Sequence, residues 1–247
     1  MTEEILTTQE NEDTPENESV AVKPKKKLSE GATYFLAAAV LLAGVYLSEL
    51  FHLLEEPLFS LVYNGNLNEM FFAVTSFLYI VGFLFAFHFT ARKYIESPFF
   101  RVKGKIDLKR TIALYLMTLL PIILVAIVLK FKFKIVYGLG EKITLMTLVG
   151  NATMYAQEAA KLVAITYFIY LIHRGVSSLF EIKGWLSYVP FGGIATILTF
   201  GIIEFFVNNT PLSLVHLILC LYYGVIWLVS EERFGITLVL SLLLYIL

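Results

Sequence analysis

A carboxylate, an amide and an ammonium lie together in the segment YAQEAAKLVAIT, residues 155–166, inside an apolar stretch from about Ile143 to Ile172. Glu158 and Lys161 are three residues apart, and Gln157 and Lys161 are four apart, so a helix places them on one polar stripe. An apolar stretch of this length is typical of a membrane span. A charge at the bilayer centre costs roughly 2.5–3.5 kcal/mol on insertion scales. The stripe must therefore face the interior of a helix bundle or a water-filled cavity.

Two further ionisable residues lie in the next two apolar runs. Glu204 is about one turn before the end of the run at 185–207, and His216 is near the start of the run at 212–230. Because consecutive spans run in opposite directions, these two residues are expected at similar depth, with Glu158 somewhat deeper. Three adjacent spans could thus bring Glu158, Glu204 and His216 to one cavity that opens toward the outer face.

Carboxylates and an imidazole suit two kinds of chemistry. Glu158, Glu204 and His216 could ligate zinc and activate a zinc-bound water. Alternatively, a carboxylate could act as general base on a water directly, with His216 and Lys161 stabilising the developing oxyanion. A third interpretation is structural: a Glu158–Lys161 pair that fixes helix packing, a Glu204 that reaches interfacial water, and a hydrogen-bonded His216. The residues alone leave the three open.

The composition predicts the elements that must position these residues. The chain has 247 residues, of which 58% are apolar and 16% charged, whereas soluble domains have about 45–50% and about 25%. The fold class expected is therefore all-α, a polytopic transmembrane bundle of six to seven spans. Its expected partners are the lipid bilayer and a membrane protein, with no nucleic acid. Because Cys220 is the single cysteine, an internal disulfide is excluded.

Hydropathy places the spans along the chain. They are predicted near 32–53, 69–90, 111–129, 146–172, 185–207 and 212–230, and a shorter run follows at 235–247. At 1.5 Å per residue, thirteen residues are too few to cross roughly 30 Å of hydrocarbon. The last run is therefore expected to enter the membrane only part-way, or to begin earlier.

The charged residues predict domain limits and orientation. Residues 1–30 are acidic and polar up to the basic run KPKKK at 23–27, and we expect a disordered tail before a single membrane domain at 31–247. The basic run and the seven Lys and Arg in the loop at 91–110 predict a cytoplasmic N-terminus in the plasma membrane. The segment at 130–142 disagrees, because it would place four lysines outside. Its alternation of Lys with Phe suits a strand-like or interfacial segment.

The order of these features resembles the PrsW family of intramembrane proteases, which is related to the CAAX-type membrane endopeptidases. The PrsW-like pattern is an acidic pair followed by x-x-Lys in one helix, then a Gly-rich helix carrying Glu, then a helix carrying His. Here it corresponds to Gln157-Glu158 with Lys161, to GGIATILTFGIIE ending at Glu204, and to PLSLVHLILCLYYG with His216. The resemblance covers roughly residues 145–230, the motif-bearing core.

The resemblance implies an intramembrane endopeptidase that cleaves a membrane-anchored protein or peptide near the outer face. Glu158 would activate water or ligate a metal, Glu204 and His216 would complete the site, and zinc would be the cofactor if a metal is used. Lys161 would stabilise the ionised form of Glu158, as a neighbouring opposite charge does. Two features depart from the family pattern: Gln157 replaces the first acid, and the last apolar run has no His.

These departures keep two other functions open. The first is a catalytically inactive scaffold or regulator on the same fold, which binds membrane proteins without cutting them. The second is a small transporter whose polar stripe lines a path. The transporter ranks last because the sequence shows no inverted repeat and no matching broken helices in two halves.

Overall fold

The computed structural model describes residues 29–59, 66–100, 145–180, 182–202 and 211–246, with positions 108–109, 111–113, 115–116, 119 and 123. Within these ranges the chain forms helices and no strand, which confirms the all-α class for this part of the molecule. The predicted tail up to residue 28, the Lys-Phe segment at 130–142 and Glu204 lie outside the described residues.

The described elements follow the predicted spans closely, apart from the run at 185–207. In chain order they are α1 (Glu30–Phe59), α2 (Asn66–Ala91), the 3₁₀ turn η1 (Pro98–Phe100), α5 (Leu145–Leu179), the 3₁₀ turn η2 (Gly184–Tyr188), α6 (Phe191–Thr196), the π-helix η3 (Ile197–Gly201), α8 (Pro211–Val229) and α9 (Phe234–Ile246).

The predicted run at 111–129 is described only at scattered positions. All of those positions are helical, and the hydroxyl of Tyr115 donates a hydrogen bond of 2.9 Å to the backbone carbonyl of Leu240 in α9. This part of the run therefore lies against the last helix.

Three described helical segments are long and apolar enough to cross a membrane: Glu30–Ser48 in α1, Val74–Ala91 in α2 and Tyr155–Leu179 in α5. This supports the prediction of a membrane protein. In hydrocarbon, every backbone N–H and C=O must be paired within the protein, and a helix achieves this within one segment. The thirteen residues of α9 span about 20 Å, less than the hydrocarbon core, as expected for the last run.

The prediction of one helix starting at residue 185 is wrong. Residues 184–188 form a separate 3₁₀ turn, in which Trp185 and Tyr188 are 74% and 80% exposed, and helix α6 begins only at Phe191. The physical reason is Pro190, because proline disfavours helical geometry in the residue before it. Accordingly, Val189 is extended, with φ −80° and ψ 121°.

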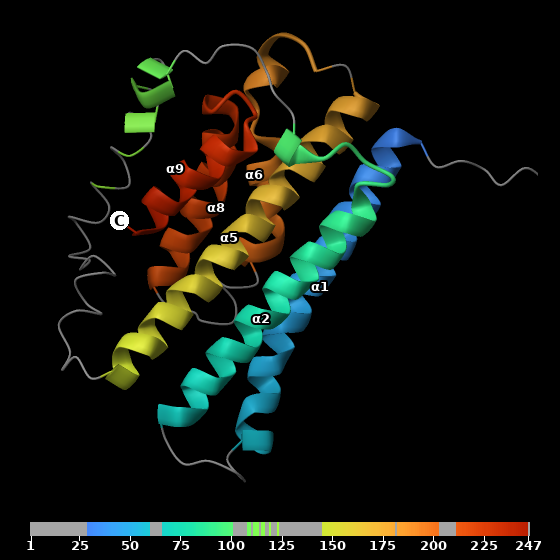
Figure 1. Cartoon of the computed structure of the whole chain (residues 1–247). Coiled ribbons are helices and arrows are strands. Elements are labelled where there is room, and N and C mark those ends of the chain that lie inside the picture. The colour runs from blue at the N-terminus through green and yellow to red at the C-terminus, as the bar shows by residue number, and fades with distance from the viewer. Residues whose placement is uncertain are drawn as a thin grey trace, which may run out of the picture.

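Helix α5 is the centre of the bundle. It lies between the α1–α2 pair on one side and the group of α6, α8 and α9 on the other (Figure 1), and it contacts all five helices. Five consecutive residues, Tyr167 to Leu171, are at most 3% exposed. Side chains at five consecutive positions point all around a helix, so this part of α5 is enclosed on every side.

Glycines allow α6 to pack tightly between α5 and α8. A Cβ at Gly192 would lie 2.8 Å from the backbone oxygen of Ile169 in α5. A Cβ at Gly193 would lie 2.7 Å from the backbone oxygen of Leu221 and 3.0 Å from the Cα of Gly224 in α8. The helix backbones therefore approach each other at distances that only small residues permit. The glycines in this run of the sequence suggested such close packing.

The turn between α8 and α9 has the hydrogen bonds of a Schellman motif. The N–H of Glu232 donates to the carbonyl of Trp227 at 2.9 Å, and the N–H of Glu231 donates to that of Leu228 at 3.1 Å. Glu231 occupies the left-handed position that glycine usually fills, with φ 55°, and Glu232 has φ 60°. Two non-glycine residues are thus held in a conformation that L-residues avoid.

We predict that Gly193→Ala lowers the free energy of unfolding by about 1–3 kcal/mol, because the added methyl overpacks the contact with α8. The measurement is thermal unfolding in detergent followed by a thiol-reactive dye, since the single cysteine, Cys220, is only 5% exposed. The matched control is Gly82→Ala, where a Cβ meets nothing within 4 Å. A wild-type unfolding temperature for Gly193→Ala contradicts the need for close approach.

We predict that Glu231→Gly raises the free energy of unfolding by about 1 kcal/mol, because glycine adopts the left-handed conformation without steric cost. Its carboxylate lies 4.0 Å from Nη2 of Arg233, and an exposed ion pair of this length contributes little. Chemical denaturation measures the change. Glu231→Ala is the control, since it removes the same charge but keeps the strain, and an equal gain in that variant refutes the conformational explanation.

Candidate functional site

The carboxylate and ammonium of the polar stripe lie next to each other on α5, as their spacing predicted. The Nζ atom of Lys161 is 3.6 Å from Oε1 of Glu158. The Lys161 side chain is 20% exposed and the Glu158 side chain 33% exposed. Within a candidate membrane span, this is a carboxylate held beside an opposite charge and still partly open to its surroundings.

Gln157 is directed toward another helix. Its Nε2 donates a hydrogen bond of 2.8 Å to Oγ of Ser76 in α2. Both residues are buried, at 5% and 1% exposure. Gln157 thus joins α5 to α2, and its amide N–H is engaged away from Glu158.

Helix α8 brings the turn that carries His216 next to η3. A Cβ at Gly201 would lie 3.5 Å from the Cα of Leu217 and 3.7 Å from Sγ of Cys220. His216 directly precedes Leu217 within α8, and Glu204 follows Gly201 by three residues. The Glu204 position and the His216 side chain lie outside what the structure describes, so their predicted convergence on Glu158 stays a prediction.

The packing of α5, η3 and α8 relates the height of Glu158 in the bundle to that of the His216 position. The ring of Phe168 in α5 meets that of Phe200 in η3 edge-on, with centroids 5.8 Å apart. Glu158 precedes Phe168 by ten residues, about 15 Å along the helix axis, and His216 precedes Cys220 by four, about 6 Å. Because α5 and α8 both run antiparallel to α6, Glu158 and the His216 position lie on the same side of this contact.

The element before Glu204 is a π-helix, which the sequence did not predict. Residues Ile197–Gly201 have π geometry, with the hydroxyl of Thr199 donating to the carbonyl of Ala195 at 2.8 Å. Such segments are rare and are frequently found at functional sites.

Among the described residues, no group of three His, Cys, Asp or Glu side chains is arranged to hold a metal ion. Of the three predicted zinc ligands, only Glu158 has a described side chain, and its carboxylate lies beside an ammonium. The zinc hypothesis therefore receives no support from the part of the site that is described.

One ion pair and one hydrogen bond at the opposite end of α5 were not predicted. Nη2 of Arg174 is 2.6 Å from Oε2 of Glu96, in the segment after α2. Nε2 of the buried His173 is 3.1 Å from Oε1 of Glu232, in the turn between α8 and α9. The partners are 78 and 59 residues apart, so only the packing of distant helices brings them together. The sequence signal was the adjacent pair of ionisable residues near the end of a span.

No protein-family model, curated protein or solved structure matches this chain. The function must therefore be argued from the geometry of its own residues.

The Glu158–Lys161 pair has a definite chemical capacity. An ionised carboxylate that is partly accessible can accept a proton from water. A neighbouring ammonium can stabilise a negative charge that develops within its reach, and both effects are larger where bulk water is excluded. The pair can thus serve hydrolysis, or it can fix a helix contact without reacting.

We predict that Gln157 and Ser76 are energetically coupled. Gln157→Ala and Ser76→Ala should each lower the free energy of unfolding by about 1–3 kcal/mol, because each leaves a buried polar group without its partner. A double-mutant cycle should give a coupling of about 0.6–1.5 kcal/mol.

The control combines Gln157→Ala with Ser177→Ala, since the Ser177 hydroxyl donates to the carbonyl of His173 in its own helix. That pair should be additive within about 0.5 kcal/mol. Additivity of the Gln157 and Ser76 changes would show that the hydrogen bond contributes nothing to joining α2 and α5.

Proposed function

We propose that this chain is a multi-pass protein of the plasma membrane, with six to seven spans and its N-terminus in the cytoplasm. The antiparallel packing of its long helices supports this topology, since Gly31 at the start of α1 adjoins Leu179 at the end of α5. Two basic clusters of the sequence, KPKKK at 23–27 and the seven Lys and Arg at 91–110, come before α1 and after α2. Membrane proteins keep such residues on the cytoplasmic side.

We further propose that the chain is an intramembrane endopeptidase of the PrsW-like type, acting on a membrane-anchored protein near the outer face. The observation that carries this proposal is the contact of 3.6 Å between Glu158 and Lys161. Charged residues in a span are expensive and mark functional sites by default. The partial exposure of both side chains favours a site over a buried packing pair.

In the proposed reaction Glu158 acts as general base. Its carboxylate takes a proton from a water molecule, and the water oxygen forms a bond to the carbonyl carbon of the scissile peptide. The carbonyl oxygen becomes an oxyanion, which the Lys161 ammonium stabilises. The carbon–nitrogen bond then breaks, and the proton held on Glu158 passes to the departing amine. Glu204 and His216 are proposed to complete the site from the neighbouring helices.

The Glu158–Lys161 pair does not suit a zinc ion. A divalent cation on the Glu158 carboxylate would be repelled by the Lys161 ammonium, because two positive charges at this separation raise the energy in a weakly screened site. The described residues therefore fit a water-activating carboxylate better than a zinc ligand.

The second candidate function is a non-catalytic membrane scaffold on the same fold. The observation that favours it is Gln157, which replaces an acid of the family pattern and is used to join α5 to α2. On this interpretation Glu158 and Lys161 form a structural pair. A partner protein then binds a surface whose shape depends on the close helix packing at Gly192 and Gly193.

We predict that Glu158→Gln lowers cleavage of the substrate by about 10²- to 10⁴-fold, the usual contribution of a general base. The measurement is quantitative N-terminal peptide profiling of host membranes, comparing wild type, a deletion, Glu158→Gln and a Glu158→Ala/His216→Ala double variant at equal expression. A peptide that disappears in the deletion and in both variants identifies the substrate.

Glu232→Gln is the matched control, since it neutralises a carboxylate at the other end of the bundle and should leave cleavage unchanged. A parallel sample with a zinc chelator tests the metal alternative. The deletion strain is complemented with each variant. If Glu158→Gln restores the wild-type phenotype fully and a variant with a bulky residue in place of Gly193 does not, the scaffold is the correct function.

A further inference from the structure

An apolar groove of about 870 Å³ lies between α1 and α2, away from the Glu158 site. Its walls include Leu36 and Val40 from α1 and Phe83, Ala86 and Phe87 from α2. Its volume is within the range of about 300–1,000 Å³ found for small-molecule sites. It is therefore large enough to receive a ligand.

The groove is closed at one end by a tight contact between the two helices. A Cβ at Gly44 would lie 2.0 Å from the ring of Phe83, so that ring rests directly on the glycine. The hydroxyl of Tyr79 also donates a hydrogen bond of 3.2 Å to the carbonyl of Gly44. From this contact the groove extends toward the start of α1 and the end of α2, over about 10–12 Å of each helix.

The walls of the groove include apolar side chains that are exposed on the outer surface of the bundle. Leu36 is 57% exposed and Val40 is 47% exposed. Both lie in Glu30–Ser48, one of the segments that can cross a membrane. If α1 and α2 are embedded as proposed, the natural occupant of this groove is a hydrocarbon chain.

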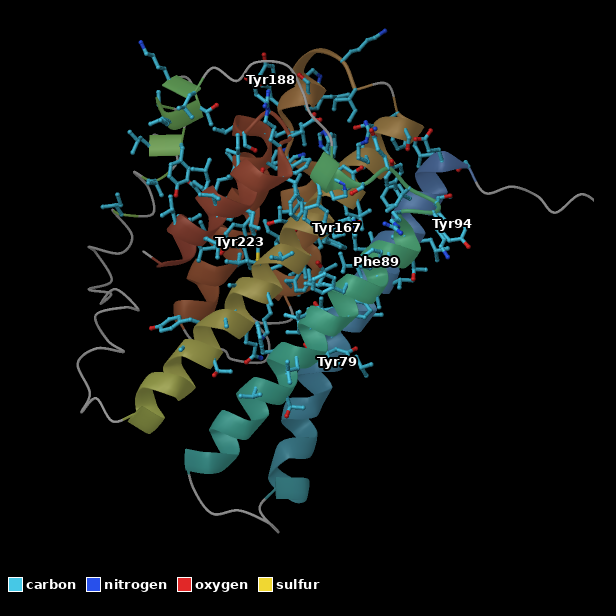
Figure 2. All side chains as sticks on the ribbon, in the orientation of Figure 1. Tyr79, Phe89, Tyr94, Tyr167, Tyr188 and Tyr223 are labelled. Carbon is cyan, nitrogen blue, oxygen red and sulfur yellow. The ribbon has the colours of Figure 1, made fainter. Side chains whose placement is uncertain are left out.

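The open end of the groove is polar and basic. Lys93, Tyr94 and Thr33 line it, and Figure 2 shows Tyr94 at the end of α2 beside the start of α1. Arg92 precedes Lys93 and lies over the ring of its neighbour Phe89 at 4.6 Å. The nearest carboxylate in the sequence, Glu96, is already paired with Arg174 at 2.6 Å. Glu30, in the first turn of α1, is the other carboxylate near this end. Arg92 and Lys93 therefore leave an excess of one positive charge, which complements an anion.

We propose that the groove between α1 and α2 binds an anionic glycerophospholipid of the cytoplasmic leaflet, with an acyl chain against Leu36, Ala86 and Phe87 and the phosphate at Lys93 and Tyr94. This inference depends on the membrane embedding of α1 and α2 and is independent of peptidase activity. Lipid-facing basic residues at the cytoplasmic surface bind anionic headgroups.

The chain's own N-terminal tail is a poorer occupant. Residues 2–19 carry acidic groups but almost no apolar side chains, with Ile5 and Leu6 as the exceptions. A segment of that composition cannot fill a groove whose walls are apolar along most of their length.

The test is native mass spectrometry of the purified full chain in detergent, titrated with phosphatidylglycerol or with phosphatidylcholine of the same acyl chains. We expect phosphatidylglycerol to bind more tightly. Lys93→Ala should weaken it roughly fivefold, the effect of one basic residue near a headgroup. The control Lys183→Ala removes an exposed lysine that is not part of the groove and should change binding less than twofold.

A second variant tests the acyl-chain part of the site. Ala86→Phe fills the groove from its rim and should weaken both lipids, whereas Ala39→Phe adds the same bulk at an exposed position of α1 outside the groove and should not. Equal binding of the two lipids to wild type, or wild-type binding by both Lys93→Ala and Ala86→Phe, overturns the proposal. Binding that appears only after residues 2–22 are deleted assigns the groove to the tail and overturns it too.

Discussion

The fold depends on one constraint: the middle of α5 is enclosed by other helices, and the helix still carries polar side chains. A buried polar side chain is costly unless it is hydrogen-bonded, so such side chains need partners within the protein. The hydroxyl of Thr166 donates to the carbonyl of Leu162 in its own helix at 2.8 Å. Gln157 uses Ser76 of α2, and Arg174 uses Glu96 beyond α2. The polar groups of the central helix thus fix the position of α2 beside it, and the glycines of α6 do the same on the other side.

Much of the helical architecture could be predicted from the sequence, because apolar length alone identifies a segment that must be helical in a membrane. The runs at 32–53, 69–90, 146–172 and 212–230 correspond to α1, α2, α5 and α8. The start of α6 was missed although Pro190 was visible, because hydropathy does not distinguish an apolar helix from an apolar 3₁₀ turn. The π geometry of η3 has no sequence signal that we can name.

The candidate site could be predicted only where its geometry is local. Glu158 and Lys161 meet because they are one helical turn apart, and that spacing is readable in the sequence. Gln157 was assigned to the same polar stripe, yet its partner Ser76 is 81 residues away. Which neighbour a polar side chain meets depends on how distant helices are rotated, and no spacing rule contains that information. The ion pair of Arg174 and the hydrogen bond of His173 escaped prediction for the same reason.

The adjacency of His173 and Arg174 has a mechanical consequence. Neighbouring positions on a helix point about 100° apart, and these two hold different connections, the segment after α2 and the turn between α8 and α9. A rotation of α5 about its axis would therefore strain both connections at once. This end of the central helix is thus fixed in rotation from two directions, by the segment after α2 and by the turn between α8 and α9.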